Sequence, residues 1–143
     1  MVVWTSNVAS GDPDFGIVAQ RFASDGTAVG GEFSVNTFTT GSQFRPRVEM
    51  RDPGAFFIVW GNDSVSAGDA DSGSLAGRRF DSAGAPIGDD FQINAYTMNN
   101  QFNPDVAIDA AGDFVATWNS FGSFGDDNDL LSIQARHFRT AGS

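Results

Sequence analysis

Three acidic segments of the chain have aspartates at a spacing that suits a hard metal ion. They read Gly11-Asp12-Pro13-Asp14, Gly68-Asp69-Ala70-Asp71 and Gly125-Asp126-Asp127-Asn128-Asp129. Ca²⁺ takes about six to eight oxygen ligands, and two aspartates at alternate positions of a glycine-containing loop can direct both carboxylates to one ion. We therefore expect Ca²⁺ as the candidate cofactor, with these ligands: Asp12, Asp14, Asp69, Asp71, Asp127 and Asp129.

A plainer interpretation of the same segments stays open. Calcium loops usually add a distal carboxylate that binds through both of its oxygens, and the three segments have none. Aspartate side chains also accept hydrogen bonds from nearby backbone N–H groups, which suits a solvated turn without any metal.

Phe121 and Phe124 are candidates for a ligand contact surface. They lie in the longest and otherwise polar loop of the chain, and the other two acidic loops have no counterparts of them. Apolar side chains exposed together are typical of a binding surface. The alternative is that the two rings fold the loop down onto the protein.

Arg79 and Arg136 are candidates for binding an anionic group. Neighbouring residues of a strand point to opposite faces, so we expect one arginine of the Arg78–Arg79 pair to line a channel and the other to face a neighbouring sheet. Together with Arg45 and Arg47, these guanidinium groups would bind a carboxylate or a sulfate. The alternative is that the arginines form ordinary ion pairs with the many aspartates.

The residues that commonly carry catalysis are scarce. The chain has one histidine, His137, no cysteine, and neither a Gly-x-Ser-x-Gly elbow nor a phosphate-binding loop. A glycosidase needs two carboxylates that flank one bond, and nothing in the sequence selects such a pair from the scattered aspartates. The sequence therefore predicts no catalytic residues and no enzymatic activity.

The composition indicates an all-β protein. The 143 residues include 16 Asp but only 2 Glu, 8 Arg but no Lys, and 17 Gly, so the usual residues of surface helices are missing while turn formers are abundant. The net charge of −10 opposes binding to nucleic acid or to an anionic membrane. The N-terminal residues do not read as a signal peptide, and no apolar stretch predicts membrane insertion.

An internal repeat organises the chain. Residues 21–60 align without gaps with residues 79–118 at an offset of 58, and fifteen of the forty aligned positions are identical. We divide one repeat domain, 1–143, into a partial repeat 1–40, a repeat 41–98 and a partial repeat 99–143, or about two and a half units. Periods of this size are typical of propellers and solenoids.

Each unit is expected to form four short strands separated by turn residues. The alternation of apolar residues and the turns between them predict ten strands: Val2–Trp4, Ile17–Phe22, Val29–Asn36, Pro46–Met50, Phe56–Trp60, Ser74–Phe80, Ile87–Asn94, Asp105–Asp109, Phe114–Trp118 and Ile133–Phe138. The strand Phe56–Trp60 is apolar throughout, so we expect it to be buried on both faces. Four antiparallel strands per unit predict propeller-like blades, with a β-sandwich as the alternative.

The repeat resembles units of large secreted or surface-attached bacterial proteins, and in strand order it resembles sialidase-type blades. The resemblance is carried by the following residues: Pro46, Val48, Gly54, Phe56, Trp60, Arg79, Phe80, Gly84, Ile87, Gly88, Phe91, Ile93 and Asn94. It covers nearly the whole chain and implies an extracellular or cell-surface location. It does not imply a sialidase active site.

Two functions follow as hypotheses. The first is a non-enzymatic extracellular module that binds carbohydrate or protein, and the second is a purely structural unit that completes its sheet or ring by self-assembly. The chain starts within a second strand and stops after a third, so we expect either a piece of a longer array or symmetric association of copies. Two copies would supply twenty strands, or five blades, which favours a homodimer among the oligomers.

The calcium hypothesis predicts a change in thermal stability. A ligand that binds only the folded state stabilises it by about 2.7 kcal/mol at a hundredfold excess over its Kd. Excess Ca²⁺ should therefore raise the melting temperature relative to a sample with chelator, as measured by differential scanning calorimetry. Equal melting temperatures with Ca²⁺ and with chelator would contradict calcium binding and would favour the interpretation of the acidic segments as solvated turns.

Overall fold

The protein is built from ten β-strands. The computed structural model describes residues 1–7, 13–51, 53–63, 73–123 and 130–140, and within these ranges it contains no helix, and so none long and apolar enough to cross a membrane. The strands are β1 (Val2–Ser6), β2 (Gly16–Phe22), β3 (Ala28–Ser34), β4 (Gln43–Met50), β5 (Phe56–Asn62), β6 (Ser74–Phe80), β7 (Pro86–Gln92), β8 (Gln101–Ile108), β9 (Phe114–Phe121) and β10 (Leu131–Phe138). The predicted all-β class is confirmed.

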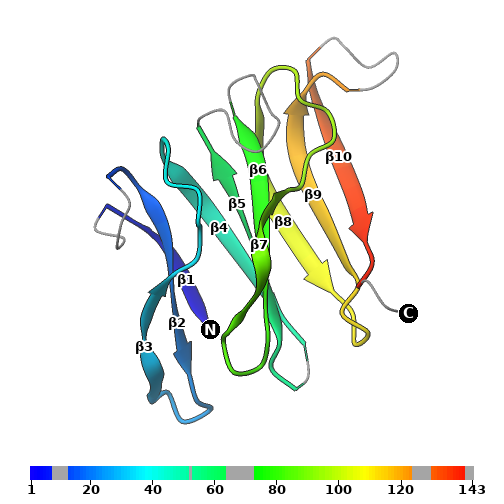
Figure 1. Ribbon diagram of the computed structural model, residues 1–143. Coiled ribbons are helices and arrows are strands. Elements are labelled where there is room, and N and C mark those ends of the chain that lie inside the picture. The colour runs from blue at the N-terminus through cyan, green and yellow to red at the C-terminus, as the bar shows by residue number, and fades with distance from the viewer. Residues whose placement is uncertain (8–12, 52, 64–72, 124–129, 141–143) are drawn as a thin grey trace.

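The strands form three antiparallel sheets, none of which closes on itself. The first sheet has the order β1-β2-β3, the middle sheet β4-β5-β6-β7 and the third sheet β8-β9-β10, so every strand pairs with its neighbour in sequence. Figure 1 shows the three sheets side by side, with the middle sheet between the other two. All ten strands overlap the predicted ranges, although β4 and β8 begin earlier and β9 ends later than expected.

The early start of β4 is explained by a bulge around a proline. The register of β4 against β5 shifts between Phe44 and Arg47, and Arg45 has a φ of 53°. Pro46 lacks an N–H group and cannot donate to a regular ladder, but a bulge accommodates it. The third sheet repeats this arrangement, with Asn103 at a φ of 54° before Pro104.

The strand β5 joins two hydrophobic cores. Phe56, Ile58 and Trp60 belong to the cluster between the first and middle sheets, whereas Phe57 and Val59 belong to the cluster between the middle and third sheets. All five side chains are buried. Since alternate residues of a strand point to opposite faces, this confirms the expectation that the strand is buried on both faces, and it makes a three-layer stack.

A buried amide relay joins the first sheet to the middle sheet. The Asn36 side chain accepts a hydrogen bond from the Ile17 N–H (2.7 Å). Its amide group donates to the Phe38 carbonyl oxygen and to Gln43 Oε1, both at 2.9 Å. Asn36 and Gln43 are both buried. Asn36 lies just after β3 and Gln43 begins β4, so the relay fixes the path of the chain between the sheets.

The same relay recurs 58 positions later, between the middle and third sheets. Asn94 accepts a hydrogen bond from the Leu75 N–H (2.9 Å), and it donates to the Tyr96 carbonyl oxygen and to Gln101 Oε1, both at 2.9 Å. Asn94 and Gln101 are again buried. The same set of side-chain hydrogen bonds thus stabilises both connections between sheets.

Removing this relay should destabilise the fold. In Asn94→Ala, the buried Leu75 N–H loses its side-chain acceptor and Gln101 loses a donor. An unsatisfied buried polar group costs about 1–3 kcal/mol. We expect the free energy of unfolding in urea to fall by about that amount, whereas Asn100→Ala, a control at an exposed position of the same connection, should change it by less than about 0.5 kcal/mol. Equal effects of the two variants would contradict the relay.

Candidate functional site

A partly open pocket lies where the segment after β3 meets the middle sheet. Its volume is about 430 Å³. Two residues come from the segment after β3 and the others from β5, β6 and β7 of the middle sheet. The residues that line it are Thr37, Phe38, Asn62, Ala76, Asp90, Phe91 and Gln92.

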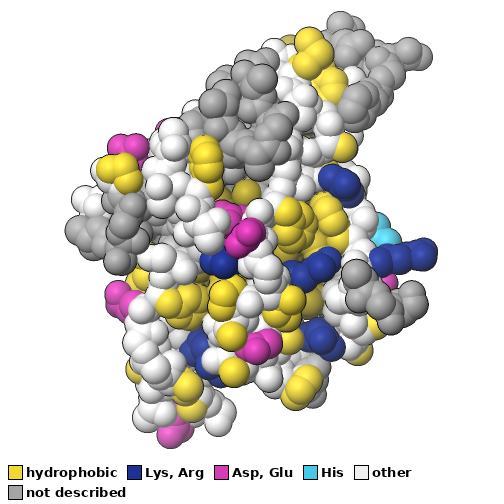
Figure 2. Space-filling view, viewed as in Figure 1, with side chains coloured by type: hydrophobic (Ala, Val, Ile, Leu, Met, Phe, Trp, Pro, Cys, Tyr) yellow, Lys and Arg dark blue, Asp and Glu magenta, His cyan; other side chains and the backbone are white. Residues whose placement is uncertain are grey.

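Asp90 of β7 binds the segment after β3 through hydrogen bonds. Its carboxylate accepts hydrogen bonds from the Thr37 N–H (2.9 Å), the Phe38 N–H (3.2 Å) and the Thr37 hydroxyl group. A carboxylate offers about four acceptor positions, so these three bonds leave capacity for one further donor. Figure 2 shows acidic and hydrophobic side chains next to each other over the part of the surface where Figure 1 draws β7.

Two amide side chains add polar groups to the pocket. Asn62 accepts a hydrogen bond from the Trp60 indole N–H (3.2 Å) and donates to the Ser74 hydroxyl oxygen (3.3 Å). The Gln92 Nε2 atom is buried and has no acceptor among the residues that the structure describes. An amide donor without a partner costs free energy.

The structure corrects the predicted placement of Phe121. We expected it in a loop, but β9 continues past Trp118, because Ser120 and Phe121 pair with Ser132 and Leu131 of β10, and Phe121 is the last residue of the strand. Its side chain is 43% exposed, and its ring centroid lies 5.5 Å from that of Phe102. Phe124 lies outside the described residues.

The two candidate arginines contact neighbouring sheets. The Arg79 guanidinium group lies 5.1 Å from the Phe114 ring centroid and 5.6 Å from that of Phe91, and it donates to the Arg139 carbonyl oxygen (3.3 Å). Arg136 lies 4.7 Å above the Phe138 ring and donates to the Ile93 carbonyl oxygen (3.1 Å).

The expectation for the Arg78–Arg79 pair is met only in part. The two side chains do point to opposite faces, but Arg78 donates to the Val35 carbonyl oxygen of the first sheet (2.9 Å), while Arg79 packs against the third sheet. Both arginines therefore bridge sheets. The residues that line the pocket include none of the predicted ligand residues.

The calcium ligands lie almost entirely outside the described residues. Of the six candidates only Asp14 is described, and the other five are Asp12, Asp69, Asp71, Asp127 and Asp129. In the described part of the chain, no three His, Cys, Asp or Glu side chains gather as a metal site would require. Calcium binding thus stays a prediction.

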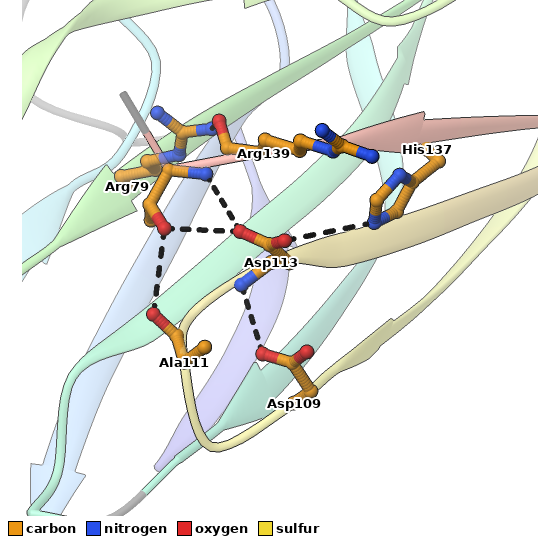
Figure 3. A network of polar contacts seen from close by, with 7 residues as sticks. Arg79, Asp109, Ala111, Asp113, His137 and Arg139 are labelled. Atoms are coloured by element: carbon orange, nitrogen blue, oxygen red, sulfur yellow. Dashed lines mark hydrogen bonds and ion pairs between the residues drawn. The ribbon is translucent and has the colours of Figure 1, made fainter. Parts of the chain in front are cut away.

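The single histidine contacts an aspartate that secures the segment after β10. His137 Nε2 lies 3.9 Å from Asp113 Oδ2, as Figure 3 shows. The other carboxylate oxygen accepts hydrogen bonds from the Thr140 N–H (2.8 Å) and the Thr140 hydroxyl group (3.0 Å). The Thr140 hydroxyl group is thus directed at Asp113 rather than at His137, so these residues do not form the relay of an activated nucleophile.

The hydrogen bonds to Asp113 also shift its titration. Its pKa is lowered from the ordinary value of 3.8, first by the Thr140 N–H and then by the Thr140 hydroxyl group. Partial burial opposes the shift, and the positive charges of His137 and Arg139 add smaller lowering contributions.

Sequence reasoning did not identify the pocket. Its walls come from residues more than fifty positions apart, Thr37 and Asp90 among them, so no local motif marks it. One signal was available, because a carboxylate recurs on the outermost strand of both units, as Glu32 and Asp90. That signal does not say which main-chain groups the carboxylate binds.

The lowered pKa of Asp113 predicts an acid-sensitive contribution to stability. A carboxyl group whose pKa is lower in the folded state stabilises the protein above its unfolded value of about 3.8 and loses that effect as the pH falls through the folded pKa. Asp113→Asn should therefore melt below the wild-type protein at pH 6, and the two melting temperatures should converge below pH 3.8. In the Asp113→Asn background, Thr140→Val should leave the pH profile unchanged. Parallel profiles of wild type and Asp113→Asn would contradict this assignment.

No family model, curated protein or solved structure matches this chain. The candidate site therefore rests on its own geometry: a pocket between the segment after β3 and the middle sheet, lined by Phe38, by the hydrogen-bonded Asp90 carboxylate and by the amide side chains of Asn62 and Gln92.

Proposed function

We propose that the chain is a non-enzymatic binding module for a neutral carbohydrate, with the pocket between the segment after β3 and the middle sheet as its ligand site. The single observation that carries the proposal is this pocket of about 430 Å³. Sites for small molecules have volumes of about 300–1,000 Å³ and combine apolar walls with a few polar groups. A concave site of this size favours a sugar over a flat protein surface.

The lining of the pocket matches the two kinds of surface that a sugar presents. Phe38 supplies aromatic surface for the C–H groups of a pyranose ring, whereas the Phe91 ring packs against Phe57 and Phe138 on the other side of the middle sheet. The Gln92 side chain contributes an amide group to the lining, and the Asp90 carboxylate keeps one acceptor position for a hydroxyl group.

Electrostatics favours a neutral ligand. The chain has a net charge of −10, and the polar wall of the pocket includes the Asp90 carboxylate. An anionic sugar would meet like charge at short range, which is unfavourable. No arginine is among the described residues that line the pocket, although Arg78 donates to the Val35 carbonyl oxygen two residues before Thr37.

We also propose that the three sheets are arranged as the blades of a propeller. Contacts between neighbouring sheets concentrate on β1, β4, β5 and β8 rather than on the outermost strands β3 and β7. This pattern supports sheets that converge on one side, as the blades of a propeller do around their axis. An extracellular or cell-surface location, implied by the resemblance of the repeat, fits a module for glycans.

A saccharide screen tests this function. Soluble neutral sugars (glucose, galactose, mannose, N-acetylglucosamine and their short oligomers) would be screened by saturation-transfer NMR, with sialic acid as the anionic comparison, and hits measured by calorimetry. We expect binding of a neutral sugar that weakens in Gln92→Met by about two- to tenfold, the effect of one hydrogen bond.

Gln134→Met is the matched control, because Gln134 is a partly buried glutamine of β10 outside the pocket. It should bind like the wild-type protein. The proposal fails if no neutral sugar of the panel binds, or if the Gln92 and Gln134 variants bind equally well.

A further inference from the structure

The outer face of the third sheet carries exposed apolar side chains, together with the polar residues Asn119, Thr117 and His137. Leu131 pairs with Phe121 and Ile133 with Asn119 across β10 and β9, and His137 pairs with Val115 in the same row, so these side chains share one face. The opposite face of β9 packs on the middle sheet through buried Phe114, Ala116 and Trp118. Ile133 is 71% exposed and Val115 is 39% exposed.

The middle sheet shows what normally covers such a face. At the offset of 58 positions, Val115 corresponds to Phe57 and Ile133 to Leu75. Phe57 is 1% exposed and Leu75 is 0% exposed, because the third sheet lies on them. The third sheet therefore repeats, on its outer side, the surface by which the middle sheet receives its neighbour.

The first sheet presents the matching half of this interface. The third sheet covers the middle sheet with Trp118 and Phe138, and the middle sheet covers the first sheet with Trp60 and Phe80. The corresponding residues of the first sheet, Trp4 and Phe22, lie on its outer side together with Val2, as the pairing of β1 with β2 shows. Val2 and Phe22 are exposed and Trp4 is partly exposed.

We propose that the outer face of the third sheet binds the outer face of the first sheet of a second copy of this chain. The chain already makes this interface twice within itself, so the occupant is specified by continuity with an established packing. A third sheet facing another third sheet would bring together two receiving surfaces, a pairing that the chain makes nowhere among its described residues.

Head-to-tail pairing of two copies closes a ring. The third sheet of each copy then contacts the first sheet of the other copy, which makes two identical interfaces. Two copies of three sheets give six sheets around one axis. Rings of about four to eight blades are the usual range of propellers. This inference does not depend on the carbohydrate site, which lies on the middle sheet and the segment after β3 of the same copy.

Light scattering after size exclusion tests the dimer. The wild-type protein should elute with about twice the 15.1 kDa mass of one chain, and the fraction of dimer should fall as the protein is diluted. Ile133→Asp on the third sheet and Val2→Asp on the first sheet should each yield monomers, because each places a charge in a desolvated interface. Met98→Asp, at an exposed apolar residue on the connection after β7, should stay dimeric.

Mixing the two variants distinguishes head-to-tail pairing from a symmetric face-to-face dimer. Ile133→Asp keeps an intact first sheet and Val2→Asp keeps an intact third sheet, so an equimolar mixture should recover association through one unaltered interface. A wild-type monomer at every concentration overturns the proposal. A dimer sensitive to Ile133→Asp but not to Val2→Asp overturns head-to-tail pairing, and a series of larger species overturns ring closure.

Discussion

The arrangement of the sheets depends on a buried side-chain amide relay that occurs at both crossings. Asn36 with Gln43, and Asn94 with Gln101, satisfy one another and a backbone N–H of the preceding sheet in places that water does not reach. Buried polar groups are expensive unless their partners are in place, so only one path of the connection satisfies them. The last strand of one sheet is thereby tied to the first strand of the next, and the offset between layers is set by hydrogen bonds as well as by apolar packing.

This constraint explains why the middle sheet is apolar on both faces. Once the relays hold a sheet on either side, β5 has no solvent face, and its odd and even residues enter different cores. The arginines reinforce the same junctions, because Arg78 and Arg136 donate to carbonyl oxygens of the preceding sheet at positions 58 apart. A guanidinium group that bonds a carbonyl oxygen and lies over a phenylalanine ring stays charged and also covers apolar surface. The same contacts thus build each layer onto the one before it.

The strands could be predicted from the sequence because their signals are local. Alternating apolar residues and Gly or Asp turns placed all ten strands, while the start of β4 depended on a bulge at Pro46 and the end of β9 on its pairing with β10. The relay residues were visible as identities of the repeat, but their role depends on contacts with another strand, such as that of Asn36 with Ile17. The pocket was invisible for the same reason, since Asp90 and Thr37 meet only after two sheets have packed.

The outer face of the third sheet has smaller apolar side chains than the corresponding face of the middle sheet. Where the middle sheet has Phe57 and Val59, the third sheet has Val115 and Thr117. These smaller or more polar residues reduce the apolar area that is exposed to solvent before association. Apolar burial contributes about 25 cal/mol per Å², so these replacements weaken an interface that would otherwise resemble the permanent core between the middle and third sheets. The first sheet keeps its bulky Trp4 and Phe22 for the same contact. The first sheet thus presents large apolar side chains and the third sheet smaller ones. This difference permits a folded chain to exist alone and still bind a second copy. It also favours contact between a first sheet and a third sheet over contact between two identical faces.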